Sequence, residues 1–162
     1  LARNKTNKII LTRPAVEAGE NLGFLPGDMD EKLEPYIQPF REVLEEYLGK
    51  GAVKWYLKEG IIEVQPLAYM QGRTFKDCWC ILDEAQNTTP KQMKMFLSRI
   101  GENSKTIING DIRQSNINTS SGLSDALMRI GDHPQVGIIE FTSDEIVRSE
   151  LAKFIIQQYE DV

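Results

Sequence analysis

Residues 80–86 read Cys80-Ile81-Leu82-Asp83-Glu84-Ala85-Gln86, a short apolar run that ends abruptly in two acids. An apolar run of this length, closed by polar residues, is typical of a strand buried on both faces of a parallel sheet. In open parallel sheets, ligands bind beyond the carboxyl ends of the strands. The stretch therefore predicts an α/β fold with Asp83 and Glu84 at its ligand-binding edge.

A second apolar run lies downstream and also ends in polar residues. Residues 105–109 predict a strand, and Gly110-Asp111-Ile112-Arg113-Gln114 follow it directly. Carboxylates at such strand ends can hold Mg²⁺, which keeps most of its water and takes one or two protein oxygens together with phosphate oxygens. The two strand ends together are typical of the metal and γ-phosphate side of a nucleotide-hydrolysing α/β domain.

The rest of the chain alternates further strands with helices. Strands are expected at residues 8–12, 61–66, 78–82 and 136–141, and helices at 30–49, 89–101, 121–130 and from about 143 or 149 to 159. Strands separated by helices pair in parallel and need cover on both faces. The sequence therefore predicts three layers around a parallel sheet.

Glycine and proline residues interrupt the N-terminal part of the chain. Pro35 and Pro39 should split the helix at 30–49 into two short helices or one broken helix, and Gly49 should end it. Residues 52–58 could continue as another helical turn, which the sequence leaves open. A surface loop is expected at 15–28, where the breakers are Gly19, Gly23, Pro26 and Gly27.

Apolar stripes and caps identify the helices and their buried faces. Thr89 is the expected N-cap and Pro90 the first residue of the helix at 89–101. The expected core-facing positions are Met93, Phe96, Leu97 and Ile100 in this helix, Leu123, Ala126, Leu127 and Ile130 in the next, and Val147, Leu151, Phe154 and Ile155 in the last. Cys78 and Cys80 point to the same face of one strand, so we expect buried thiols rather than a disulfide.

Bulk properties narrow the class of protein. The 162 residues suffice for one compact domain with a substantial core, and we expect residues 1–162 to form a single domain. The net charge of −5 argues against a dominant basic face for nucleic acid, although a local patch can occur within an acidic total. No apolar run approaches the roughly 20 residues of a membrane span, and no signal-peptide pattern opens the chain. We therefore expect a cytoplasmic protein with no membrane partner.

The acids and amides at the strand ends suit different chemical roles. Asp83 is the candidate Mg²⁺ ligand. Glu84 would orient and deprotonate an attacking water as a general base. Gln114 could contact both the γ-phosphate and that water through its neutral amide. Gln86 could do similar work, or it could link the nucleotide site to a bound strand.

Arginines could neutralise charge on a transferred phosphoryl group. Arg148, directly before a predicted helix, is the candidate for this role, within its own subunit or toward a neighbouring one. Arg13 and Arg73 are weaker candidates of the same kind. Each feature alone has a structural interpretation, because arginines form surface salt bridges and a strand ending in Asp-Glu is often only a solvated turn. The combined pattern favours function.

One element that should accompany this pattern is absent from the sequence. No G-x-x-x-x-G-K-[ST] stretch occurs, and the pair Gly49-Lys50 has Leu44 where the first glycine should be. Such a loop cradles phosphates with its backbone N–H groups. Because the chain begins with Leu1 rather than Met, we expect a piece of a larger protein, or its ordered part. Truncation, disorder and true loss of the loop all remain open.

Several stretches closely resemble the PhoH family of phosphate-starvation-type ATPases. They are residues 11–20 (LTRPAVEAGE), 22–27 (LGFLPG), 66–74 (PLAYMQGRT), 81–89 (ILDEAQNTT), 110–114 (GDIRQ), 121–123 (SGL) and 141–143 (FTS). The likeness extends from about residue 8 to residue 159. It implies a RecA-like P-loop NTPase core related to the first motor domain of superfamily 1 helicases, here incomplete at its N-terminal side.

The resemblance also implies ligands and roles. ATP and Mg²⁺ are the implied ligands, a part in RNA metabolism is suspected, and members are thought to assemble as rings. A Walker A loop would lie upstream of residues 8–12, outside this chain. Asp83 and Glu84 match the Walker B pair, and Gln114 matches the glutamine of helicase motif III. Arg148 falls on a family arginine that could act across a ring interface. Further nucleotide-binding candidates are Gln86, Asp111, Arg113 and Arg13.

Three residues depart from the family pattern. Asn109 stands where a small or hydroxylated residue is expected, Arg113 where threonine is usual, and Ser149 where histidine commonly follows the arginine. None is expected to touch the chemistry directly. Arg113 does place a cation near the expected phosphate site, so it joins the candidates for nucleotide or nucleic-acid binding.

We therefore predict that the intact protein hydrolyses ATP with Mg²⁺ and uses the cycle to act on RNA. The first alternative is a binding or assembly module that keeps the fold without turning over nucleotide. A more distant alternative is a helicase motor that needs only one such domain per subunit of a homo-oligomeric ring. A Walker A sequence encoded just before Leu1 would favour the enzyme over the module.

Overall fold

The structure is a computed structural model that describes residues 6–14, 29–116, 120–141, 145 and 149–160. The chain divides into two compact units, Leu1–Arg129 and Ile130–Val162. The strands are β1 (Ile9–Arg13), β2 (Ile62–Pro66), β3 (Trp79–Leu82) and β4 (Lys105–Ile108). The α-helices are α1 (Met29–Leu48), α2 (Lys50–Lys58), α3 (Pro90–Leu97), α4 (Gly122–Ile130) and α5 (Glu150–Glu160). Short 3₁₀ turns are η2 (Leu67–Met70), η3 (Ala85–Asn87) and η4 (Ile112–Gln114).

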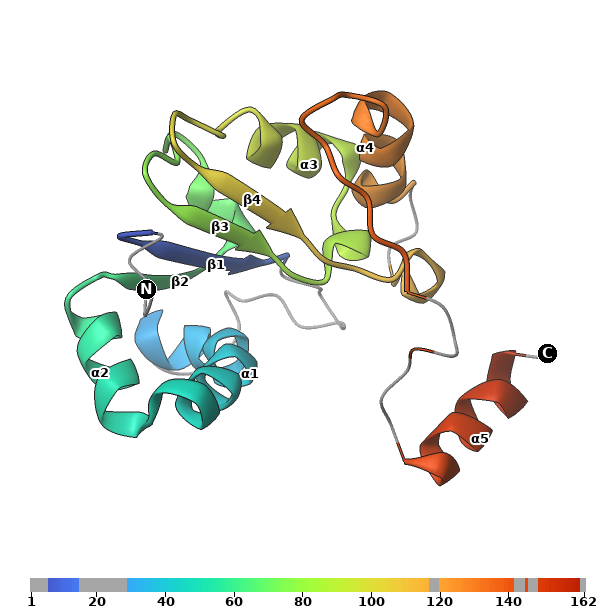
Figure 1. Cartoon of the computed structure of the whole chain (residues 1–162), viewed down its shortest axis with the longest axis horizontal. Helices are drawn as coiled ribbons and strands as arrows, with labels where there is room; N and C mark the ends of the chain where they lie inside the picture. The colour runs from blue at the N-terminus through green and yellow to red at the C-terminus, as the bar shows by residue number, and fades with distance from the viewer. Residues whose placement is uncertain (1–5, 15–28, 117–119, 142–144, 146–148, 161–162) are drawn as a thin grey trace. The chain divides into compact units, whose positions relative to one another are not determined.

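The four strands form one parallel sheet in the order β2-β1-β3-β4. Figure 1 shows α1 and α2 on one side of this sheet and α3 and α4 on the other. The predicted α/β class and the covered parallel sheet are confirmed. In the register, Thr12 pairs with Leu82, and Leu82 with Ile108. The carboxyl ends of β1, β3 and β4 are therefore level with one another.

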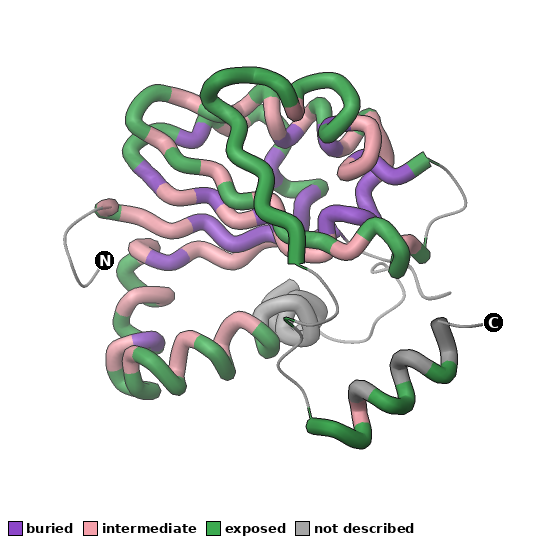
Figure 2. Tube along the Cα trace, turned by 45° about the vertical axis from the view of Figure 1, so that its right-hand side comes forward, coloured by how far each residue is buried: buried purple, intermediate pink, exposed green. Residues whose placement is uncertain are grey.

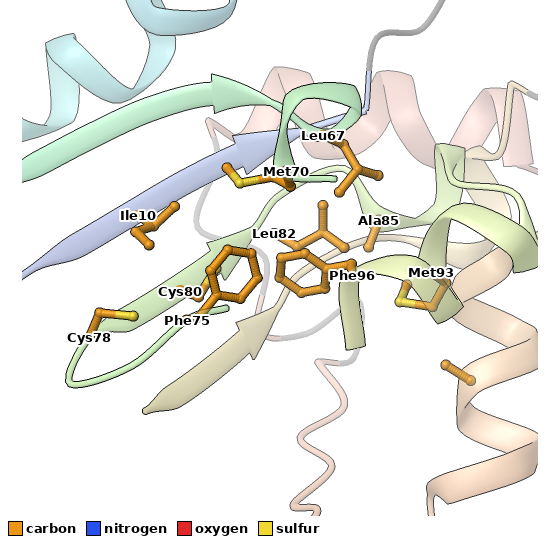
Figure 3. Close-up of a cluster of buried hydrophobic side chains, with 11 residues drawn as sticks. Ile10, Leu67, Met70, Phe75, Cys78, Cys80, Leu82, Ala85, Met93 and Phe96 are labelled. Atoms are coloured by element: carbon orange, nitrogen blue, oxygen red, sulfur yellow. The ribbon is translucent and has the colours of Figure 1, made fainter. Parts of the chain in front are cut away.

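The main core lies between the sheet and α3, and its side chains are drawn in Figure 3. Alternate residues of β3 supply it, because Cys80 and Leu82 are fully buried while Trp79 and Ile81 on the other face are only half-buried. Phe96 of α3 packs against Phe75 with ring centroids 5.7 Å apart. Figure 2 shows buried residues both along the strands and in the turns and helices beside them.

Helix α3 begins as the sequence predicts. Thr89 is its N-cap, and Pro90 is its first residue. The Thr89 side chain accepts a hydrogen bond from the Gln92 amide, and the Gln92 side chain accepts one from the Thr89 amide at 2.8 Å. This reciprocal capping box satisfies amide groups that the first helical turn would leave unpaired. It fixes the helix start directly after the loop that carries Asp83 and Glu84.

The prediction that prolines would break the first helix is wrong. Helix α1 runs continuously from Met29 to Leu48, through Pro35 and Pro39. A proline removes one amide donor but its fixed φ is compatible with a helix, so the remaining hydrogen bonds of a 20-residue helix can carry it. Gly49 ends α1 as predicted, with a φ of 80° that favours glycine. Residues 52–58 do continue as helix, within α2.

Two predictions for the second unit are also wrong. Residues 136–141 form no strand, and Ile139 and Phe141 are exposed. A β-rich segment becomes a strand only when a neighbouring strand completes its hydrogen bonds, and no described residue pairs with this one. Helix α5 forms as expected, but its predicted core residues Leu151, Phe154 and Ile155 are exposed. Val147 lies outside the described residues, as does the predicted loop at 15–28.

The cysteines are buried, as predicted, and this has a measurable consequence. Burial raises the pKa of Cys78 and raises the pKa of Cys80 to about 12. Since only the thiolate reacts, a raised pKa lowers the fraction of each cysteine that is in the reactive thiolate form at a given pH. At pH 8 we expect both native thiols to resist a disulfide reagent such as dithionitrobenzoate, and to react fully in urea. Rapid labelling of the native protein would contradict the burial.

Candidate functional site

Three side chains from neighbouring strands meet at the carboxyl edge of the sheet. Arg13 ends β1, Asp83 directly follows β3, and Asn109 directly follows β4. The Asp83 Oδ2 atom accepts a hydrogen bond from Arg13 Nε at 3.1 Å and lies 2.9 Å from Arg13 Nη2. Its Oδ1 atom accepts one from Asn109 Nδ2 at 2.9 Å. Asp83 is therefore held from both sides in a fixed orientation.

Glu84 adopts a left-handed backbone conformation, with φ 53° and ψ 38°. A non-glycine residue in this region pays roughly 1–2 kcal/mol in steric strain, and such residues cluster at functional sites. Hydrogen bonds hold the turn, because the Ala85 amide donates to the Asn109 carbonyl and the Asn87 amide donates to the Glu84 carbonyl. The Glu84 side chain is 44% exposed, against 19% for Asp83. The second acid is thus the more accessible one.

Gln86 joins the two strand ends. Its side chain is buried, with 2% of its surface exposed. Its Nε2 atom donates to Glu84 Oε2 at 2.7 Å, and its Oε1 atom accepts from the Asp111 amide at 3.2 Å. A buried amide whose donor and acceptor are both used in this way positions its neighbours. In this structure Gln86 connects Glu84 to the segment after β4.

Asp111 organises the turn that follows β4. Its Oδ1 atom accepts from the Arg113 amide at 2.9 Å, and its Oδ2 atom accepts from Gln114 Nε2 at 3.0 Å. The Arg113 side chain also lies beside it, with Nε 3.5 Å from Oδ1. A continuous chain of hydrogen bonds therefore runs from Glu84 through Gln86 and Asp111 to Gln114. The two strand ends that the sequence analysis singled out do come together.

Gly110 leaves the space that Gln86 fills. A Cβ atom at this position would lie 2.6 Å from Gln86 Oε1 and 3.0 Å from the Gln86 backbone nitrogen. Gly110→Ala should therefore push the Gln86 amide away from Asp111 and lower the free energy of unfolding by roughly 1–3 kcal/mol, the usual effect of overpacking. Urea denaturation measures this. Gly137→Ala, where a Cβ meets nothing within 4 Å, is the control; equal effects of the two changes would contradict the contact.

Arg73 lies beside a different strand. It contacts Glu63 at 2.6 Å and Gln65 at 2.9 Å, both on β2, which β1 separates from β3 and Asp83. Burial raises the pKa of Glu63, but hydrogen bonds and charges from Lys8 and Arg73 outweigh it, so the pKa is lowered overall. Arg73 therefore serves an ion-pair cluster of its own. Arg148 lies outside the described residues.

Asn109 is not expected from the sequence to touch the chemistry directly, yet its side chain donates a hydrogen bond to Asp83, the candidate Mg²⁺ ligand. Sequence reasoning treated it only as a departure from a family pattern. Register was the signal that could have found it, since parallel strands of equal length place the residues after their ends side by side. The same register positions Arg13, at the end of β1 on the other side of β3.

The side chains at this edge suit Mg²⁺. No three His, Cys, Asp or Glu residues among those the structure describes gather closely enough to hold a metal by themselves. Mg²⁺ bound together with a nucleotide does not need such a cage, because phosphate and water supply most of its ligands. Asp83 with Glu84 beside it provides the one or two carboxylates that remain. Separately, none of the described helices has both the length and the apolar character to cross a membrane.

Comparison with known proteins agrees with the resemblance noted in the sequence. The family model described as "PhoH: PhoH-like protein" matches residues 1–160. The chain is 49% identical over 162 residues to "PhoH-like protein" of Bacillus subtilis (strain 168), covering 99% of this chain and 51% of that protein. It is 47% identical over 163 residues to "Protein PhoH" of Escherichia coli (strain K12), covering 98% and 46%.

A third relative has the same relation to the chain. Against "PhoH-like protein" of Mycobacterium tuberculosis (strain ATCC 25618 / H37Rv), identity is 45% over 161 residues, covering 98% of this chain and 46% of that protein. The chain thus spans about half the length of the curated relatives it matches. Since the family model covers nearly every residue, including all of the strand-end residues described above, the chain belongs to the PhoH family.

Proposed function

We propose that this chain is the Walker B and γ-phosphate-sensing half of a Mg²⁺-dependent ATPase. One observation carries the proposal: the hydrogen-bonded chain from Glu84 through Gln86 and Asp111 to Gln114, with Asp83 at the same sheet edge. An acid that activates water and an amide that senses phosphate must share one ligand. Side chains joined in this way can do so. Membership of the PhoH family, which suggests a P-loop NTPase-like protein, supports the same assignment.

Each residue has a distinct role in the proposal. Asp83 would hold Mg²⁺, which when bound neutralises charge on the phosphate oxygens. Glu84 takes the proton of the attacking water, and its left-handed backbone conformation and its hydrogen bond from Gln86 fix where its carboxylate lies. Gln114 contacts the terminal phosphate. A change in the position of the Gln114 side chain would then shift Glu84 through the hydrogen bonds of Asp111 and Gln86. Arg113 adds positive charge beside this site.

Further parts of the proposal concern the whole protein. By family resemblance, a Walker A loop supplied from outside residues 1–162 completes phosphate binding, and Arg148 acts on the phosphate within a ring of identical subunits. Single-stranded RNA is the proposed polymer substrate and the cytoplasm the proposed compartment. These rest on the resemblance rather than on contacts described above.

The test is ATP hydrolysis by the protein expressed from its complete gene, with Mg²⁺ or with excess EDTA, and with or without single-stranded RNA. Mg²⁺-dependent turnover supports the ATPase, and stimulation by RNA supports the motor. ATP hydrolysis that RNA does not stimulate would contradict the RNA-driven motor but would still support an ATP hydrolase. No turnover would favour a binding module that keeps the fold. The observation that favours this alternative is that both Asp83 oxygens already accept hydrogen bonds, from Arg13 and Asn109.

A further inference from the structure

Arg13 makes an unusual set of contacts for a residue at a strand end. Its Nη2 atom lies 2.9 Å from Asp83 Oδ2 and 3.3 Å from Glu84 Oε1. Its Nε atom donates to the same Asp83 oxygen at 3.1 Å. Its guanidinium carbon lies 5.6 Å from the centre of the Phe40 ring, on α1. One cation is thus shared by both acids and stacked on an aromatic ring.

This arrangement solves an electrostatic problem. Two adjacent carboxylates, one of them largely buried, repel each other, and a positive charge between them offsets this repulsion. Arg13 supplies such a charge, with 23% of its own side chain exposed. A divalent metal at Asp83 would also supply positive charge there. It would also lie beside a guanidinium that is already within hydrogen-bond distance of the same carboxylate, and the two cations would repel each other.

We propose that Arg13 is a positioning residue that orients Asp83 and Glu84 in the metal-free site and competes with Mg²⁺ for Asp83. The inference rests on the proposed function, in which Asp83 is the metal ligand. When the metal binds, Arg13 leaves Asp83 and stays on Glu84 and the Phe40 ring. The metal affinity of the site is therefore set partly by a residue that never contacts the metal.

The Phe40 ring can still hold the Arg13 side chain after it has left Asp83. A cation over an aromatic ring is attracted by the negative charge of the ring face. This attraction does not depend on Asp83, so it remains after the metal has bound. Because Phe40 belongs to α1, the contact that Arg13 keeps lies on the side of the sheet opposite α3.

The experiment compares Mn²⁺ affinity among variants of the protein expressed from its complete gene, by calorimetry in the presence of ADP. Arg13→Ala should bind Mn²⁺ roughly five- to tenfold more tightly, because a partly exposed ion pair no longer has to be broken. Arg13→Lys keeps the charge and should lie between Arg13→Ala and the unchanged protein. Phe40→Leu removes only the ring and should shift the affinity less than Arg13→Ala.

Arg73→Ala is the matched control, since it also breaks a partly buried arginine–carboxylate pair, but one on β2 that includes neither Asp83 nor Glu84. Its Mn²⁺ affinity should be unchanged. Weaker or equal binding by Arg13→Ala, while the unchanged protein binds and Asp83→Asn does not, would overturn the competition and leave the proposed function intact. If the unchanged protein binds no Mn²⁺ with ADP, both the inference and the metal role of Asp83 are wrong.

Discussion

Glu84→Gln should lower the rate of ATP hydrolysis by roughly 10²–10⁴-fold, the usual contribution of a general base. The substitution keeps the size of the side chain and an oxygen that can still accept the hydrogen bond from Gln86, and the contact that it gives up is the longer one from Arg13 to Glu84 Oε1. What it removes is the ability to take a proton from water. Nucleotide affinity should change little, because Asp83, the proposed metal ligand, keeps its carboxylate.

Single-turnover hydrolysis and calorimetric binding of a non-hydrolysable ATP analogue measure the two effects separately. Glu102→Gln is the matched control, because Glu102 is exposed in the loop before β4 and lies away from the strand ends. It should leave both quantities unchanged. If Glu84→Gln retained hydrolysis within about tenfold of the unchanged protein, Glu84 would not be the base in the sense proposed.

Phe96→Ala should lower the free energy of unfolding by about 3–5 kcal/mol, the range for removing a large aromatic ring from a core. Phe96 is fully buried and packs against Phe75 in the core between the sheet and α3. Its removal leaves a cavity that the parallel strands and the capped helix α3 cannot easily fill. Because α3 begins directly after the turn that carries Glu84, the loss should also loosen the functional edge.

Urea denaturation of the same protein tests this, with Met128→Ala as the control. Met128 lies on α4 with 81% of its surface exposed, so its truncation should change stability by no more than about 0.5 kcal/mol. A loss below about 1 kcal/mol for Phe96→Ala would show that the ring does not occupy the core in solution.

Local patterns predicted much of the sheet and its helices. The apolar run ending at Leu82 marked a buried strand, and alternation within it matches the burial of Cys80 and Leu82. The Thr89-Pro90 pair marked a helix start because its capping chemistry lies within four residues. Pro35 and Pro39 misled the prediction, because a long helix with many other hydrogen bonds tolerates residues that would break a short one. Residues 136–141 misled it because strand formation needs a partner that the local sequence does not contain.

The sequence by itself determined the class of fold, the family and the residue types at the candidate site, because apolar runs, caps and motifs are local features. Only the tertiary structure decided which of those residues touch. The register of three parallel strands brings Arg13 and Asn109 to Asp83. The buried Gln86 side chain joins Glu84 to Asp111 through its hydrogen bonds. Hydrogen bonds between residues 25 or 70 positions apart depend on how separate strands align, and no single segment carries that information.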